Sequence, residues 1–321
     1  MRTILTAALL IAALPAAAET LIVGNKGEDT VSFIDLASGR ELARSASGAN
    51  PHEVALSPDG ARAAVVNYGA AAIDVYAVPG GERLATWDIG PNSRPHGLLW
   101  LPDGRLVATA EASKTLVVID GKDGRVLQSI PTEAEGSHMV AVHPSRPRAY
   151  TANMKSGSAS VIDLESGRTV GHLPAGREAE GIAITPDGKE VWISSRGSNE
   201  VHVYDTATDR LVRRIETGPF PLRIAISPDG KHAVTSELQA GALGVYSVAT
   251  GKRERTIPVS GKGEAMQVTL LFRPDGKRLF VAETGTNTVA ELEWPSGKVL
   301  RRFPVGVNGD GLGWSPAGGA K

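Results

Sequence analysis

The chain contains 321 residues, of which 34 are basic and 35 acidic, and its formal net charge is −1. Such a balanced charge gives no basic surface for nucleic acid or an anionic membrane, so we expect neither as a partner. The sequence has no cysteine, which excludes disulfide bonds, thiolate metal ligands and covalently attached c-type haem.

The first predicted element is a cleaved secretory signal peptide over residues 1–18. Arg2 supplies a positive charge, residues 4–14 form an apolar run of suitable length, and small residues predict cleavage after Ala18. No later stretch approaches the ~20 continuous apolar residues of a membrane-spanning helix. We therefore expect a periplasmic or secreted protein whose folded part covers residues 19–321.

A turn built around proline recurs along the rest of the chain. It occurs seven times, at Pro58, Pro102, Pro144, Pro186, Pro228, Pro274 and Pro316. The prolines lie 44, 42, 42, 42, 46 and 42 residues apart, and a period in the forties with short alternating strands is typical of a β-propeller. After Pro186, for example, the strands "KEVWISS", "VHVYD" and "LVRRIET" precede "RIAIS" of the next repeat.

The two ends of the folded part predict how the ring closes. The mature chain starts with three strands, "TLIVGNK", "TVSFIDL" and "ELARSAS", and a single strand, "DGLGWS", precedes the last turn. Together they complete a seventh blade and leave no open sheet edge. We therefore predict an all-β fold: one seven-bladed β-propeller of four-stranded antiparallel blades, expected as a monomer.

The repeats also resemble a known family. The phrases "TPDGKEVWISSRGSNEVHVYDTATDR" and "TLIVGNKGEDTVSFIDLASGRELA" are similar to the YVTN-type β-propeller repeat, and the resemblance covers nearly all of the mature chain. It implies the propeller fold; its relatives include lactonase-like enzymes and amine dehydrogenase heavy subunits, so it implies little about function. A WD40 propeller fits poorly because the only "WD", at Trp87 and Asp88, falls on a predicted outermost strand.

One position, which we call the slot, can be compared across all seven repeats. It lies six residues before each turn proline and is occupied by His52, His96, His138, Glu180, Leu222, Val268 and Asp310. The innermost strands begin here, so these side chains should converge at one mouth of the central channel. Duplication of one ancestral histidine would explain the repetition without function. Glu180 and Asp310 favour a functional role for the slot, because their carboxylates can also bind metal ions or protons.

A second repeated position lies nine residues after each turn proline and is expected on the same face. From it we predict ligand or cofactor contacts by Asn67, Glu111, Asn153, Glu237 and Glu283. Asparagine is also the ordinary turn residue of this repeat, so the glutamates are the residues that depart from the repeat pattern. The longest repeat carries an insertion near the start of its innermost strand, which leaves Gln267 as an alternative to Val268 in the slot and as a further ligand contact.

The slot residues suit two kinds of chemistry. As metal ligands, the imidazoles and carboxylates of His52, His96, His138, Glu180 and Asp310 would suit a divalent Zn, Mn, Fe or Cu ion and leave room for a water or substrate. Without metal, His96 or His138 could act as a general base with Glu180 as its partner. Arg223 could hold an anionic substrate, but it follows the slot by one residue, so we expect it on the other face of its strand in an interblade salt bridge.

Three functions follow from these patterns. The leading one is binding of a divalent metal or a small polar ligand at the channel mouth. The second is lactonase-like or metal-dependent hydrolysis or elimination on a small anionic or sugar-derived substrate. The third is a scaffold whose face docks a periplasmic protein.

Overall fold

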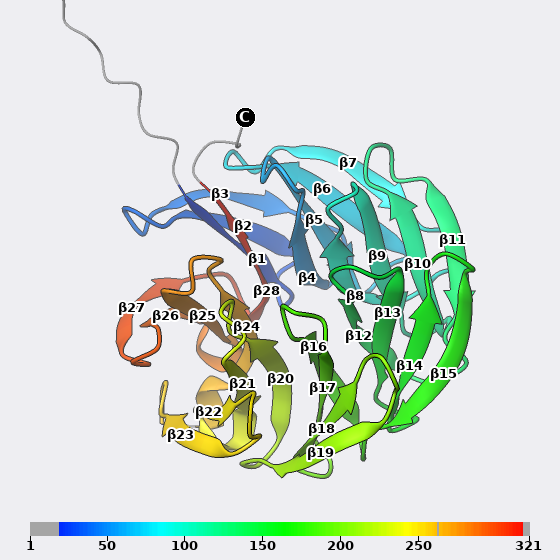
Figure 1. The fold of residues 1–321 in the computed structure, drawn as a ribbon. Coiled ribbons are helices and arrows are strands. Elements are labelled where there is room, and N and C mark those ends of the chain that lie inside the picture. Colours follow the sequence, from blue (N-terminus) through cyan, green and yellow to red (C-terminus); the bar gives the residue numbers. More distant parts are fainter. Residues whose placement is uncertain (1–18, 262, 317–321) are drawn as a thin grey trace, which may run out of the picture.

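The computed structural model describes residues 19–261 and 263–316, which form seven four-stranded antiparallel sheets arranged as blades around a central axis (Figure 1). The predicted seven-bladed propeller is confirmed. The predicted signal peptide lies outside the described residues, so export and localisation stay predictions. Within the described ranges, no helix has the length and apolar character needed to cross a membrane.

The innermost and second strands of the blades determine where the site lies. The innermost strands of blades 1 to 7 are β4 (Pro51–Leu56), β8 (Pro95–Trp100), β12 (Ser137–Val142), β16 (Ala179–Ile184), β20 (Pro221–Ile226), β24 (Gln267–Phe272) and β28 (Gly309–Ser315). The second strands are β5 (Arg62–Asn67), β9 (Arg105–Ala110), β13 (Arg148–Asn153), β17 (Glu190–Ser195), β21 (His232–Glu237), β25 (Arg278–Glu283) and β1 (Thr20–Asn25). Each slot residue is therefore the second residue of an innermost strand.

The remaining strands complete the blades outward. The third strands are β6 (Ala72–Ala77), β10 (Thr115–Asp120), β14 (Ser158–Asp163), β18 (Glu200–Asp205), β22 (Ala242–Ser247), β26 (Thr288–Glu293) and β2 (Thr30–Asp35). The outermost are β7 (Arg83–Asp88), β11 (Val126–Pro131), β15 (Arg168–Pro174), β19 (Leu211–Glu216), β23 (Arg253–Ile257), β27 (Val299–Pro304) and β3 (Glu41–Ala46). Among the described residues, three 3-10 helices lie in loops of blades 5 and 6: η1 (Leu238–Ala240), η2 (Gly263–Ala265) and η3 (Thr284–Thr286).

Blade 7 is built from two distant parts of the chain, as predicted. Its strand order is β28-β1-β2-β3, and β1 pairs with β28 from Thr20↔Ser315 to Asn25↔Gly309. This pairing satisfies the backbone groups of β1 that would otherwise form an open edge. The ring is thereby closed by hydrogen bonds between segments almost 300 residues apart.

In blades 1 to 6, the recurring turn links the innermost strand to the second strand. In blade 1, Gly60 has a φ of +70°, and the Asp59 carboxylate accepts hydrogen bonds from Ser57 Oγ and the Ala61 amide. Glycine adopts this φ without strain, and the aspartate satisfies a backbone donor within the turn. Blade 3 lacks this Asp-Gly pair, and there His143 Nδ1 accepts from the amides of Ser145 and Arg146. His143 therefore has a structural role in the turn of blade 3.

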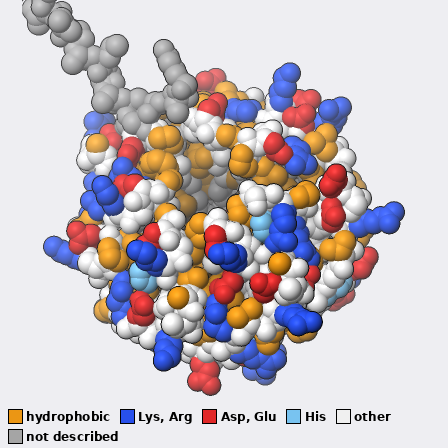
Figure 2. Space-filling model, in the orientation of Figure 1, with side chains coloured by type: hydrophobic (Ala, Val, Ile, Leu, Met, Phe, Trp, Pro, Cys, Tyr) orange, Lys and Arg blue, Asp and Glu red, His pale blue; other side chains and the backbone are white. Residues whose placement is uncertain are grey.

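The hydrophobic core lies between neighbouring blades. Second and third strands are buried on both faces, whereas outermost strands alternate between half-buried and exposed side chains. One apolar cluster, for example, joins Val66 and Val75 of blade 1 to Ala108 and Val117 of blade 2. The interblade packing holds each innermost strand at a fixed distance from the axis. On the face shown in Figure 2, basic and acidic side chains are interspersed, in keeping with the balanced net charge.

Candidate functional site

The strand pairing decides whether Val268 or Gln267 occupies the slot in blade 6. Pro51 pairs with Asn67 in blade 1, and Gln267 pairs with Glu283 in blade 6, so Gln267 is the structural equivalent of Pro51. Val268 therefore occupies the slot, and the alternative placement of Gln267 there is wrong. The Gln267 side chain instead donates a 2.7 Å hydrogen bond from Nε2 to Ser260 Oγ.

The slot side chains converge on one cavity, which we call the mouth cavity. It has a volume of about 410 Å³ and is lined by all seven slot residues: His52, His96, His138, Glu180, Leu222, Val268 and Asp310. The slot is therefore a ring around the axis and not a set of separate interblade positions. This geometry is what a shared binding site requires, although it does not by itself assign a ligand.

Three of these slot residues form a row of imidazoles from consecutive blades. The ring centroids of His52 and His96 are 4.4 Å apart, and those of His96 and His138 are 3.5 Å apart. His96 is only 1% exposed. Burial, followed by the neighbouring His138 and His52, lowers the pKa of His96 well below its ordinary value. His96 is accordingly neutral at physiological pH.

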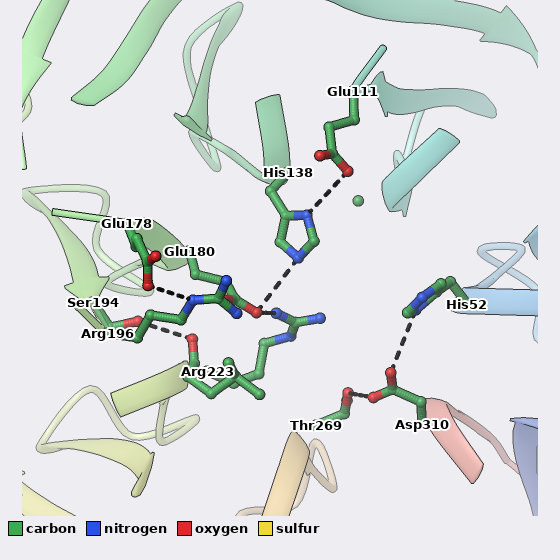
Figure 3. Close-up of polar contacts among 12 residues, drawn as sticks. His52, Glu111, His138, Glu178, Glu180, Ser194, Arg196, Arg223, Thr269 and Asp310 are labelled. Carbon is green, nitrogen blue, oxygen red and sulfur yellow. Dashed lines mark hydrogen bonds and ion pairs between the residues drawn. The ribbon is translucent and has the colours of Figure 1, made fainter. Parts of the chain in front are cut away.

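His138 lies between two carboxylates, as Figure 3 shows. Its Nδ1 is 3.7 Å from Glu111 Oε2, and its Nε2 is 3.4 Å from Glu180 Oε1. Burial lowers the pKa of His138, but Glu111 and Glu180 outweigh it, so the pKa is raised overall. Burial conversely raises the pKa of Glu111, whereas His138 and Tyr68 lower it, leaving it at about 2. The three groups form a buried imidazole with a carboxylate on each side.

Arg223 crosses the axis, which corrects its predicted orientation. Its guanidinium is buried and donates to Glu180 Oε1 of blade 4 at 2.8 Å and to Glu53 Oε1 of blade 1 at 3.0 Å. Figure 3 shows it pointing into the space enclosed by His52, His138 and Asp310. The predicted buried salt bridge exists, but it spans the channel as well as joining neighbouring blades. Arg223 is therefore part of the mouth cavity.

A β-bulge explains why both the slot residue and the residue after it face the axis. In blade 5 the pairing jumps from Pro221↔Glu237 to Ile224↔Thr235, and blade 1 shows the same jump between Pro51 and Val54. A bulge places two residues opposite one and breaks the strict alternation of side chains. Glu53, which the sequence analysis missed, reaches the axis in the same way. Comparing this next position across the repeats would have revealed Glu53 and Arg223 as its two charged occupants.

Asp310 joins blade 7 to blade 1. Its carboxylate accepts hydrogen bonds from Lys26 Nζ at 2.6 Å and Thr269 Oγ1 at 3.0 Å, and it lies 3.4 Å from His52 Nδ1. Burial raises the pKa of Asp310, but His52 and Lys26 outweigh it and hold the pKa well below the ordinary value. Lys26, in the loop after β1, is a second site residue that the sequence analysis missed.

Two further residues complete the polar wall. Tyr68 donates from its hydroxyl to Glu111 Oε2 at 2.7 Å and lies edge-on to His52, with ring centroids 5.2 Å apart. Arg196 contacts Glu180 Oε2 at 2.6 Å. Both follow second strands directly, in loops whose repeat position carried no recognisable signal in the sequence.

Glu111 differs from the other residues predicted at the second repeated position. In blade 2, Ala110 takes the place of Asn67, because Pro95 pairs with Ala110 as Pro51 pairs with Asn67. The turn at Pro102 is one residue shorter than the others, so counting nine residues from the proline overshoots the strand. Glu111 consequently lies in the loop beyond β9, from which it reaches His138.

The other members of this second set point into their own blades. Asn153 donates to Ser160 Oγ at 2.9 Å, Glu237 accepts from the Gly218 amide at 2.9 Å, and Glu283 accepts from Arg302 Nε at 2.7 Å. Asn67 is buried against Gly48. These four do not line the mouth cavity, although the sequence predicted ligand or cofactor contacts for them. Their contacts are those of structural residues that satisfy loop and strand groups.

The site offers one compact group of potential metal donors among the described residues. Ligand atoms of His52, Glu53 and His96 all lie within 4.8 Å of one another. Only two of the five predicted metal ligands belong to this group, and Glu53 was not predicted. The carboxylates of Glu53 and Asp310 are already paired with Arg223 and Lys26. A divalent ion would therefore have to compete with cations already in place.

The fold has structural relatives of low sequence identity. A chain of "Kuenenia stuttgartiensis Hydrazine Synthase" matches with a TM-score of 0.76 and 18% identity, covering 90% of this chain and 99% of that one. A functionally unknown protein from Desulfotomaculum acetoxidans matches with a TM-score of 0.79 and 13% identity, covering 93% and 99%. At these identities the likeness shows the fold alone. No curated protein matches the chain.

A family model extends this likeness to the sequence. The model described as "Lactonase, 7-bladed beta-propeller" matches residues 24–270, which include six of the seven slot residues and all of blades 1 to 5. The match covers well over half of the chain and agrees with the seven closed blades seen in the structure. The chain therefore belongs to the seven-bladed β-propeller lactonase family.

Proposed function

We propose that the mouth cavity binds a small polar ligand and that the reaction there is the hydrolytic opening of a lactone, with His138 as the acid–base group. The observation that carries this proposal is the position of His138 on the cavity wall between Glu111 and Glu180. A carboxylate on an imidazole fixes its orientation and stabilises its charged form. Membership of a lactonase family supports the choice of reaction.

The proposed step balances with water as the only co-reactant. Neutral His138 accepts a proton from water while the water oxygen bonds to the lactone carbonyl carbon. The ring C–O bond then breaks, and His138 returns the proton to the departing ring oxygen, which gives a hydroxy acid. Arg223, Arg196 and Lys26 lie on the cavity wall and would attract the negative charge that develops on the carbonyl oxygen.

Replacing His138 tests the proposal directly. His138→Gln should lower kcat/KM for lactone opening by about 10²–10⁴-fold, measured as acid release in a pH-stat. The matched control is His172→Gln, because His172 lies exposed on β15 of the same blade. Equal turnover in the two variants would contradict the role of His138. Thermal melting should show that both variants remain folded.

Binding of a divalent metal is a second candidate, favoured by the His52, Glu53 and His96 group. The Nδ1 atom of His96 is buried without a hydrogen-bond partner among the described residues, so its lone pair is available to a metal ion. Protein purified without a histidine tag should contain about one metal ion per chain by elemental analysis, and His96→Gln should abolish it. Metal-free protein that gains no metal on dialysis against Zn²⁺ would rule this candidate out.

A further inference from the structure

The mouth cavity has two unlike walls. The imidazoles and charged groups come from blades 1 to 4 and blade 7, apart from Arg223. In blades 5 and 6 the slot carries Leu222 and Val268, and three further apolar side chains line the cavity there: Phe220, Leu238 and Met266. We call these five residues the apolar wall.

The loops of blades 5 and 6 hold the apolar wall together. The Leu238 amide donates to the Phe220 carbonyl at 3.1 Å, and Met266 follows η2 directly before β24. Leu222 and Val268 form the buried base of the wall, whereas the Met266 side chain is 40% exposed. The arrangement leaves apolar surface facing the same space as the histidines. Removing such surface from water favours binding of an apolar group.

We infer that the ligand is amphipathic: an alkyl or aryl substituent packs on the apolar wall while the reacting polar group lies at His138. The second half of this inference rests on the proposed function. A polyhydroxylated sugar lactone would place hydroxyl groups against Leu222 and Val268, whose side chains offer no hydrogen-bond partner, and would lose the hydrogen bonds that it makes to water. The ligand class is thus an alkyl- or aryl-substituted lactone or its hydroxy acid.

Matched lactones test the inference by their relative kcat/KM. The probes are γ-butyrolactone, γ-nonalactone, dihydrocoumarin and D-glucono-δ-lactone. Each methylene that packs on the apolar wall should raise kcat/KM for γ-nonalactone over γ-butyrolactone by about fourfold. Preference for D-glucono-δ-lactone over both substituted lactones would overturn the inference while leaving lactone opening intact.

Near-isosteric variants test whether the preference for the substituted lactone comes from the apolar wall. Met266→Gln and Val268→Thr should each lower the ratio of kcat/KM for γ-nonalactone to that for γ-butyrolactone by about fivefold. Leu84→Gln is the control, because Leu84 is an exposed apolar residue on β7, far out on blade 1. A ratio that falls equally in Leu84→Gln, or that falls in neither wall variant, would overturn the inference.

A binding measurement separates this inference from the proposed reaction. Octanoate should raise the melting temperature more than gluconate at equal concentration, and Met266→Gln should remove the difference. If no lactone is opened but this difference is found, the amphipathic site stands and the proposed reaction fails. If gluconate stabilises the protein as much as octanoate does, or neither has an effect, the inference is overturned whatever the turnover.

Discussion

The two repeated positions behave differently although both carry carboxylates in several blades. At the slot, Glu180 contacts His138 and Arg223 from the two neighbouring blades. Asp310 likewise contacts His52 of blade 1. At the end of the second strand, Glu237 and Glu283 bind Arg253 and Arg302 within their own blades. The difference shows that distance from the propeller axis decides the role of a repeated polar residue. Polar residues next to the axis contact side chains of other blades, whereas those one strand further out pair within their own blade.

The largest expected effect is on the free energy of unfolding, when the arginine that pairs with the carboxylates at each position is removed. Arg223→Met leaves Glu53 and Glu180 buried without their shared cation and should lower the free energy of unfolding by about 3–5 kcal/mol. Arg302→Met should cost only about 1–2 kcal/mol, because the Arg302 side chain is 41% exposed and already partly hydrated. The buried Glu283 carboxylate also keeps the hydrogen bond from Thr288 Oγ1 at 2.9 Å. Urea denaturation measures both. Equal losses would contradict the distinction between the two positions.

The second largest expected effect is a loss of stability in acid, caused by protonation of the carboxylates near the axis. The pKa of Glu111 is about 2 in the folded protein against 4.5 ordinarily, so its ionised form contributes stability above pH 4.5 that is lost as the pH falls towards 2. Asp310 acts in the same direction. The urea midpoint should therefore fall between pH 7 and pH 3, and it should fall less in Glu111→Gln.

The smallest effect concerns the ionisation of His138. Glu111→Gln removes a carboxylate that favours the imidazolium, so the pKa of His138 should fall. Glu237→Gln, at the structural position, should leave that pKa unchanged even if it destabilises blade 5. NMR titration of the imidazole protons measures both variants. A shift of similar size in Glu237→Gln would show that the two positions are not independent.

The fold and the slot could be predicted because both depend on the repeat period. Each turn proline lies seven residues after the start of an innermost strand, so counting backwards from Pro58 or Pro144 locates that start correctly. Closure by β28 followed from counting strands at the two ends. These features recur with the repeat, so they can be recognised in a single sequence.

The rest of the site could not be predicted because it depends on departures from that regularity. A turn shorter by one residue moves Glu111 out of its strand and into reach of His138. A β-bulge turns Glu53 and Arg223 towards the axis, against the alternation that a strand predicts. Lys26 and Tyr68 reach the site from loops, where side-chain direction does not follow from periodicity.

The closure of blade 7 also sets an order of events during synthesis. Lys26 emerges early, but its partner Asp310 lies on β28, the last of the described strands along the chain. At ordinary rates of translation the two are separated by on the order of tens of seconds. Through that interval β1 has one unpaired edge and the row of histidines lacks its carboxylate neighbour at His52. A nascent chain can therefore form several blades before the mouth cavity is complete.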